Sequence, residues 1–236
     1  MNEFRHWRNT KHLKHLQQAV LFALLLVIGS LKVAAVDFDR MQNVLSQRFG
    51  PAAVASLRDW QKLLQENADQ PASVKLTRVN DFFNRRIRFG EDLEIWGQID
   101  YWATPMETLG RGAGDCEDFT IAKYFTLLLL NIPDEKLRLI YVQARLAGVN
   151  GGSITQAHMV LAFYPVPDIE PLILDNLIND LQPASRRPDL QPVFSFNQQG
   201  LWQGVSGASG ARAAAGPASL SRWQDLLKRA RAEGFD

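Results

Sequence analysis

The spacing of apolar and polar residues predicts three amphipathic helices in the first part of the chain. In residues 37–49 apolar side chains recur with a helical period, and Gly50 ends the pattern. The same period continues through 51–64, where Pro51 suits a first helical turn, and again through 74–87. Each segment is therefore expected to bury one face against its neighbours.

A fourth helix is predicted at residues 116–130. Asp115 is its expected N-cap, and Asn131-Ile132-Pro133 ends it. Apolar residues nearly surround this segment, so we expect it to be the central, buried helix. Residues 89–110 are loop-rich, and a last amphipathic helix is expected at 223–232.

Three strands are predicted after the central helix, at 137–144, 157–164 and 171–174. Helices followed by antiparallel strands indicate one α+β domain. We place this domain at residues 36–200, with a helical N-terminal part packed on an antiparallel sheet. Residues 201–236 are expected to form a flexible Gly/Ala-rich segment and the last helix.

Residues 1–35 have the pattern of a secretory signal peptide. Four basic residues precede an apolar run at 19–31, and Val33-Ala34-Ala35 offers small residues for cleavage after Ala35. The alternative is an uncleaved inner-membrane anchor, although the apolar run is shorter than the roughly 20 residues that a membrane span needs. Cleavage would place the protein in the periplasm.

Removal of residues 1–35 changes the charge and the chemistry of the chain. The remainder has 21 basic and 24 acidic residues, net −3, so nucleic acid is not an expected partner. It keeps one cysteine, Cys116, and one histidine, His158. A single cysteine excludes an internal disulfide and a multi-thiolate zinc site. Cys116 is therefore either buried and inert or retained for its thiol chemistry.

Cys116 is expected in the first turn of the buried helix. The N-terminus of a helix favours a thiolate, and its free N–H groups can bind a developing oxyanion. The alternative is a small buried apolar residue. Its position between Asp115 and Glu117 argues against that alternative, because apolar packing does not select such a setting.

His158 and Asp175 are expected to face each other across a hairpin. If the strands at 157–164 and 171–174 pair around the turn at 165–170, the two side chains lie opposite each other, about 5 Å apart at Cβ. A carboxylate there would orient an imidazole. A histidine satisfied in the core is the alternative. With Cys116, the set has the Cys-His-Asp arrangement of papain-like and transglutaminase-like enzymes.

Three carboxylates, Asp115, Glu117 and Asp118, surround the thiol in the sequence. Alone they raise the pKa of Cys116, whereas a hard cation bound to their oxygens would cancel that effect, and such ligands suit Ca²⁺. Helix capping by the same acids is the alternative, and both stay open.

Five sequence blocks resemble the bacterial transglutaminase-like cysteine proteinases, and the resemblance covers about residues 37–195. The blocks are Tyr101-Trp-Ala-Thr-Pro105, Gly112-Ala-Gly-Asp-Cys-Glu-Asp-Phe119, Ile121-Ala-Lys-Tyr124, Lys136-Leu-Arg-Leu-Ile-Tyr-Val142 and Ala157-His-Met-Val160.

This resemblance implies a site and a function. Cys116 would be the nucleophile, His158 the base and Asp175 its orienter, and the carboxylates of Asp115, Glu117 and Asp118 would bind calcium. The family members are periplasmic, cut the N-terminal region of large surface adhesins at a di-alanine site and so release cells from a biofilm. An inner-membrane cyclic-di-GMP receptor sequesters the protease. Two alternatives stay open: a transglutaminase or cell-wall amidase with the same triad, and a non-catalytic calcium-binding module.

Overall fold

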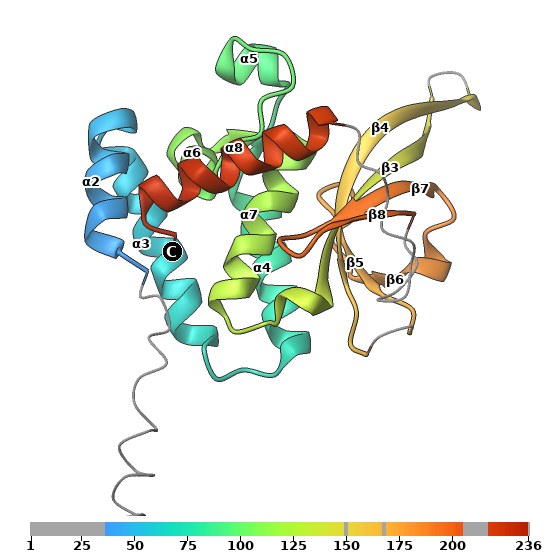
Figure 1. Cartoon of the computed structure of the whole chain (residues 1–236), viewed down its shortest axis with the longest axis horizontal. Coiled ribbons are helices and arrows are strands. Elements are labelled where there is room, and N and C mark those ends of the chain that lie inside the picture. The colour runs from blue at the N-terminus through green and yellow to red at the C-terminus, as the bar shows by residue number, and fades with distance from the viewer. Residues whose placement is uncertain (1–35, 149–150, 167–168, 205–216, 236) are drawn as a thin grey trace, which may run out of the picture. The chain divides into compact units, whose positions relative to one another are not determined.

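The computed structural model describes residues 36–148, 151–166, 169–204 and 217–235, and residues 37–235 form one compact unit (Figure 1). Within the described residues, seven α-helices pack on a six-stranded antiparallel sheet. The predicted α+β class is confirmed. The predicted signal peptide lies outside the described residues. In the described part of the chain, no helix combines the length and the apolar character needed to cross a membrane.

The first three helices form where the apolar period predicts them. They are α2 (Phe38–Phe49), α3 (Pro51–Asn67) and α4 (Ala72–Arg86). Asp37 caps α2 by accepting a hydrogen bond from the Arg40 N–H at 2.9 Å. Gly50, with a φ of 81°, separates α2 from α3 in a conformation that favours glycine. Their buried faces carry large apolar side chains, among them Met41, Leu45, Leu57, Trp60, Leu76 and Phe83.

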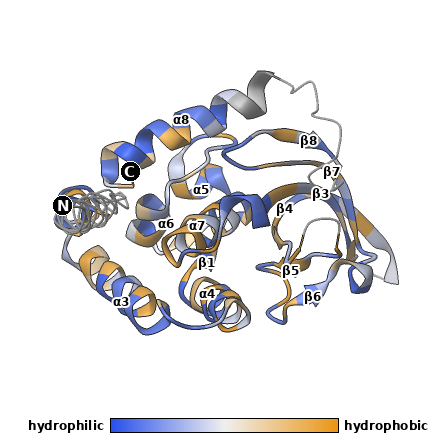
Figure 2. Cartoon of the chain, turned by 60° about the horizontal axis from the view of Figure 1, so that its bottom comes forward, coloured by the Kyte–Doolittle hydropathy of each residue, from blue (hydrophilic) through white to orange (hydrophobic). Residues whose placement is uncertain are grey.

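Helix α7 (Cys116–Leu129) is the central helix, as its sequence predicts. It contacts α4, α6 and the sheet, and Figure 2 shows it largely hydrophobic in colour among the other helices. The Asp115 side chain accepts hydrogen bonds from the N–H groups of Glu117 and Asp118 at 3.1 and 3.3 Å. The predicted N-cap is therefore confirmed.

The sheet has the order β6-β5-β4-β3-β7-β8. Its strands are β3 (Leu137–Ala147), β4 (Ser153–Phe163), β5 (Leu172–Leu174), β6 (Gln182–Pro183), β7 (Leu190–Phe196) and β8 (Leu201–Gln203). The three predicted strands are β3, β4 and β5. β3 and β4 pair along their full length, and their joined end projects beyond the other strands as a two-stranded arm (Figure 1).

The segment expected to be loop contains regular structure. It holds α5 (Asp92–Trp96) and α6 (Pro105–Arg111), and it is flanked by the short parallel strands β1 (Arg88–Phe89) and β2 (Ala113–Gly114). Thr104 and Glu107 form a capping box at the start of α6. A Thr followed three residues later by Glu, with Pro between them, was the available sequence signal for this helix.

A buried carboxylate, Glu107, joins α6 to helices from both ends of the chain. It accepts hydrogen bonds from Arg48 of α2 at 2.6 Å and from Arg229 of α8 (Pro217–Glu233) at 2.5 Å. Burial would raise the pKa of Glu107, but the Thr104 N–H and the two guanidinium groups outweigh it and lower that pKa. This network fixes α8 against the N-terminal helices.

The C-terminal helix belongs to the same compact unit as the rest of the domain. The boundary expected at residue 200 falls inside the β7–β8 hairpin, and α8 packs beyond it. Trp223 of α8 is 2% exposed and contacts the rings of Tyr124, Phe125 and Phe196 at 5.3–6.1 Å. The Gly/Ala-rich residues 205–216 lie outside the described residues.

Replacing Trp223 with Ala should lower the free energy of unfolding by about 3–5 kcal/mol, because it leaves a large cavity between α7, α8 and the sheet. Urea denaturation measures the loss, with Gln224→Ala at the adjacent exposed position as the control. Equal stability of the two variants would show that the packing of α8 does not contribute to the stability of the domain.

Candidate active site

The start of α7 lies against a part of β4 that β5 leaves uncovered. β5 pairs with β4 only at residues 161–163. Nearer the arm, the Thr120 hydroxyl of α7 donates to the Met159 carbonyl at 3.0 Å, and the Met159 N–H lies close enough to the Cys116 thiol to favour its thiolate form. These contacts hold Cys116 beside the residue that follows His158.

His158 and Asp175 are paired, as the sequence predicts. His158 Nε2 lies 2.8 Å from Asp175 Oδ1, and both side chains are 1% exposed. An ionised carboxylate only accepts hydrogen bonds, so Nε2 donates and Nδ1 of the neutral imidazole is an acceptor. Among the described residues no hydrogen bond joins His158 to Cys116, whose thiol donates to Glu117 Oε2 at 2.8 Å.

The predicted register of this pair is wrong by two residues. The ladder joins Leu161 to Leu174, so position 177 rather than Asp175 would lie opposite His158. A shift of two preserves the face of each strand, because side chains alternate between faces. Asp175 therefore still lies on the His158 face, but it follows the last residue of β5 and reaches His158 diagonally.

Arg187 holds the other oxygen of Asp175, a role that no sequence motif indicated. Its Nη2 donates to Asp175 Oδ2 at 2.8 Å, while its Nε donates to Asp189 Oδ1 at 3.0 Å. The Leu177 N–H donates to Asp175 Oδ1 at 3.0 Å. Burial would raise the pKa of Asp175, but the hydrogen bonds with His158, Leu177 and Arg187 outweigh it and lower the pKa to about 2.

A second cation, Lys123, lies near Asp175 from the side of α7. It is 1% exposed, and burial lowers its pKa to about 7 although the charge of Asp175 acts in the opposite direction. It also lies over the Phe119 ring at 5.7 Å. Asp175 is thus an ionised carboxylate in a buried, cationic setting.

Three other carboxylates lie close together near the start of α7. Ligand oxygens of Asp92, Asp115 and Asp118 all lie within 4.8 Å of one another. Asp118 Oδ1 accepts from the Ala103 N–H at 2.8 Å. Asp118 Oδ2 and Asp92 Oδ1 are buried and have no hydrogen-bond partner among the described residues. These two orphaned oxygens point to a missing positive partner.

Burial and mutual repulsion act on the pKa values of this cluster. Burial raises the pKa of Asp92 to about 6, with Glu117 and Asp100 adding to the shift. Burial, followed by neighbouring carboxylates, also raises the pKa values of Asp115 and Asp118. A hard cation with oxygen ligands fits this arrangement, because it would supply the missing charge and bind the orphaned atoms.

The sequence located two members of this cluster. Asp115 and Asp118 lie together as expected, whereas the Glu117 carboxylate lies against the Cys116 thiol. Asp92 was missed because it begins α5, inside the segment expected to be loop. Whether Glu117 joins the ligand set stays a prediction.

The surroundings of the Cys116 thiol disfavour its ionisation to the thiolate. Burial raises the pKa of Cys116 well above its usual value, and the charges of Glu117 and Asp115 raise it further. The Met159 N–H acts in the opposite direction but does not compensate. The direction agrees with the expected effect of the acidic residues on the thiol.

Trp102 is a packed aromatic residue. It is 5% exposed and stacks on Phe196 at 5.5 Å between ring centroids.

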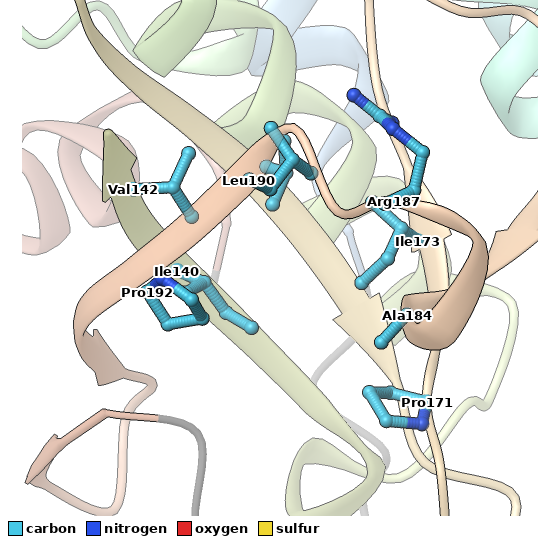
Figure 3. A pocket seen from close by; sticks show the side chains of 9 residues that line it. Ile140, Val142, Pro171, Ile173, Ala184, Arg187, Leu190 and Pro192 are labelled. Carbon is cyan, nitrogen blue, oxygen red and sulfur yellow. The ribbon is translucent and has the colours of Figure 1, made fainter. Parts of the chain in front are cut away.

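A separate cavity of about 170 Å³ lies on the sheet beside Arg187 rather than at Cys116 (Figure 3). Its lining is almost entirely apolar and consists of Ile140, Val142, Val160, Pro171, Ile173, Ala184, Arg187, Leu190 and Pro192.

A family model supports the resemblance seen in the sequence. The model of the bacterial transglutaminase-like cysteine proteinases (BTLCP) matches residues 57–194. A comparison with curated proteins gives no significant match.

The solved structures of LapG from Legionella pneumophila are similar to this chain. One has 37% sequence identity and a TM-score of 0.66, covering 84% of this chain and 99% of LapG. An EGTA-treated form has 37% identity and a TM-score of 0.67, covering 84% and 100%. A calcium-bound form has 39% identity and a TM-score of 0.64, covering 81% and 98%.

Replacing Arg187 with Met should lower the free energy of unfolding by about 3 kcal/mol, because it leaves the buried carboxylate of Asp175 without its ion pair. Urea denaturation measures this loss, and NMR titration should show a higher pKa for Asp175. Arg186→Met, at the exposed neighbour, should change stability by less than about 0.5 kcal/mol. Similar stability of both variants would contradict the assigned contact.

Proposed function

Since this chain belongs to the bacterial transglutaminase-like cysteine proteinases, we propose that it is a periplasmic, calcium-dependent cysteine endopeptidase. The observation that supports this most is the placement of Cys116 beside Met159, next to a His158 held by Asp175. Three residues distant in sequence thereby supply a thiol, a base and an orienting carboxylate in one region.

In the proposed reaction, His158 Nδ1 takes the thiol proton as Cys116 Sγ attacks the scissile peptide carbonyl. The backbone N–H of Cys116, at the start of α7, helps to bind the oxyanion. His158 then gives the proton to the leaving amine, and a water molecule hydrolyses the thioester. Asp175, held by Arg187, keeps the imidazole oriented and stabilises its charged form.

The carboxylate of Glu117 must leave the thiol before this proton transfer, because it accepts the thiol hydrogen bond in the structure. Asp92, Asp115 and Asp118, with Glu117, would hold the calcium ion. When bound, the ion supplies positive charge that offsets the negative potential of these acids at Cys116. The calcium-bound and EGTA-treated states of L. pneumophila LapG support calcium as the metal.

The family resemblance also supports a substrate and a partner. We propose that the protein cleaves the N-terminal region of a large surface adhesin and so promotes biofilm dispersal. An inner-membrane cyclic-di-GMP receptor would sequester it. The signal-like residues 1–35 support the periplasmic location.

Replacing Cys116 with Ala should abolish cleavage of an adhesin N-terminal fragment, because no other thiol exists in the chain. Gel electrophoresis and mass spectrometry measure cleavage, and thermal unfolding confirms that the variant is folded. Cleavage by that variant would overturn the assignment of the nucleophile.

The same preparation tests the two alternative functions. Incorporation of an amine into a glutamine peptide, or release of peptidoglycan fragments, without adhesin cleavage would favour a transglutaminase or amidase. Resistance of Cys116 to iodoacetamide at neutral pH, with calcium bound and no product in any assay, would favour a non-catalytic calcium-binding module.

Calcium should reverse the pH dependence of stability. The folded-state pKa values of Asp92, Asp115 and Asp118 are raised, so without metal their contribution is favourable below about pH 4 and falls as the pH rises. The part that comes from Asp92 is lost through about pH 6, and the parts from Asp115 and Asp118 are lost at higher pH. With calcium at about 100 times its Kd, stability at pH 7 should rise by about 2.7 kcal/mol.

Thermal unfolding at several pH values, in EGTA and in calcium, measures both effects. Asp92→Asn should stabilise the EGTA form at pH 7 and reduce the calcium-induced shift, whereas the exposed control Glu135→Gln should change neither. A calcium shift of equal size in Asp92→Asn would remove Asp92 from the ligand set.

A further inference from the structure

The outer edge of β4 carries main-chain groups that point away from β3. Tyr164 N–H donates to the Lys136 carbonyl, and the Gly152 carbonyl accepts from Gly148, so even-numbered residues direct their main-chain groups toward β3. Odd-numbered residues direct theirs to the opposite edge, because N–H and C=O directions alternate along a strand. Met159 agrees with this, since its carbonyl accepts a hydrogen bond from Thr120 of α7.

This edge is divided into three stretches. Residues 161–163 pair with β5, and Met159 is covered by Thr120 and Cys116. Residues 153–157, on the projecting arm in Figure 1, pair with β3 only, and all five are exposed. No other described segment hydrogen-bonds to the outer edge of this stretch. The uncovered edge therefore ends at the thiol.

We infer that an extended peptide substrate adds to β4 as a further strand along residues 153–157, which brings its scissile bond to Cys116. This inference rests on the proposed protease function. The outward N–H and C=O groups of Ser153, Thr155 and Ala157 would pair with substrate main chain. Such pairing does not depend on the substrate side chains, which leaves sequence selectivity to other contacts.

The position of the edge limits the substrate in two ways. Only a segment that can become fully extended can pair with it, so the cleaved site must lie in a flexible or locally unfolded region. Pairing also occurs on one side of the scissile bond only, because β5 occupies the continuation of the edge beyond Met159. A substrate folded around the cleavage site would not be cut.

Backbone N-methylation of the substrate tests this inference without altering the enzyme. The probe is a short synthetic peptide centred on an Ala-Ala pair, methylated at one amide at a time. On one side of the cleaved bond, methylation at alternate positions should lower kcat/KM about tenfold, the factor that corresponds to one lost hydrogen bond. Intervening positions, and those on the other side, should change kcat/KM less than about threefold.

A substitution in the chain gives a second test. Thr155→Pro removes an outward N–H from an edge where proline is tolerated, so it should lower kcat/KM about tenfold, mainly through KM. Alkylation of Cys116 by iodoacetamide in the same variant should keep its rate, because a small reagent does not need the edge. An unchanged melting temperature checks the fold.

The outcomes separate the inference from the proposed function. Failure of the unmethylated peptide and of the adhesin fragment to be cleaved at all would overturn the protease proposal. If the peptide is cleaved normally but methylation has no effect, or has the same effect at successive positions, only the pairing with β4 is overturned. Normal kcat/KM for Thr155→Pro would do the same.

Discussion

Two contacts between the start of α7 and the outer edge of β4 decide where the thiol lies. The Thr120 hydroxyl donates to the Met159 carbonyl, and the Met159 N–H reaches Cys116. The Met159 carbonyl would otherwise be buried without a partner, which costs more than a hydrogen bond gains. Satisfying it helps to fix the depth and rotation of α7 against the sheet. Because Met159 follows His158, the same contacts bring the sulfur to the residue next to the imidazole.

The two sides of the site around Cys116, the His158–Asp175 pair and the acidic cluster, balance their charges in different ways. Near the base, His158, Leu177 and Arg187 hydrogen-bond Asp175, so this buried carboxylate stays ionised with protein groups alone. Near the first turn of α7, no basic side chain of the described residues pairs with Asp92, Asp115 or Asp118, and their pKa values are raised. A bound cation would therefore change the acidic side and leave the His158–Asp175 pair intact.

Local sequence signals predicted the parts of this site that depend on neighbouring residues. The helix of Cys116, its Asp115 cap and the shared face of His158 and Asp175 follow from period, capping chemistry and alternation. Asp92 begins a five-residue helix and Arg187 follows a short 3-10 turn, so neither lies in a segment with a hydrophobic period, and their roles arise from contacts with distant residues. Tertiary contacts of this kind cannot be predicted from the local spacing of apolar and polar residues.

The predicted β4–β5 register, which is wrong by two residues, would be incompatible with the position of Cys116. In the expected register Leu174 would lie opposite Met159, and β5 would occupy the edge that α7 now uses. Cys116 could then not approach the residue after His158. In the observed register β5 ends early, Asp175 leaves the ladder, and its carboxylate can meet His158, Leu177 and Arg187 together. A hairpin that places His158 directly opposite Asp175 would thus exclude Cys116 from the site. The diagonal contact between His158 and Asp175 leaves room for all three side chains.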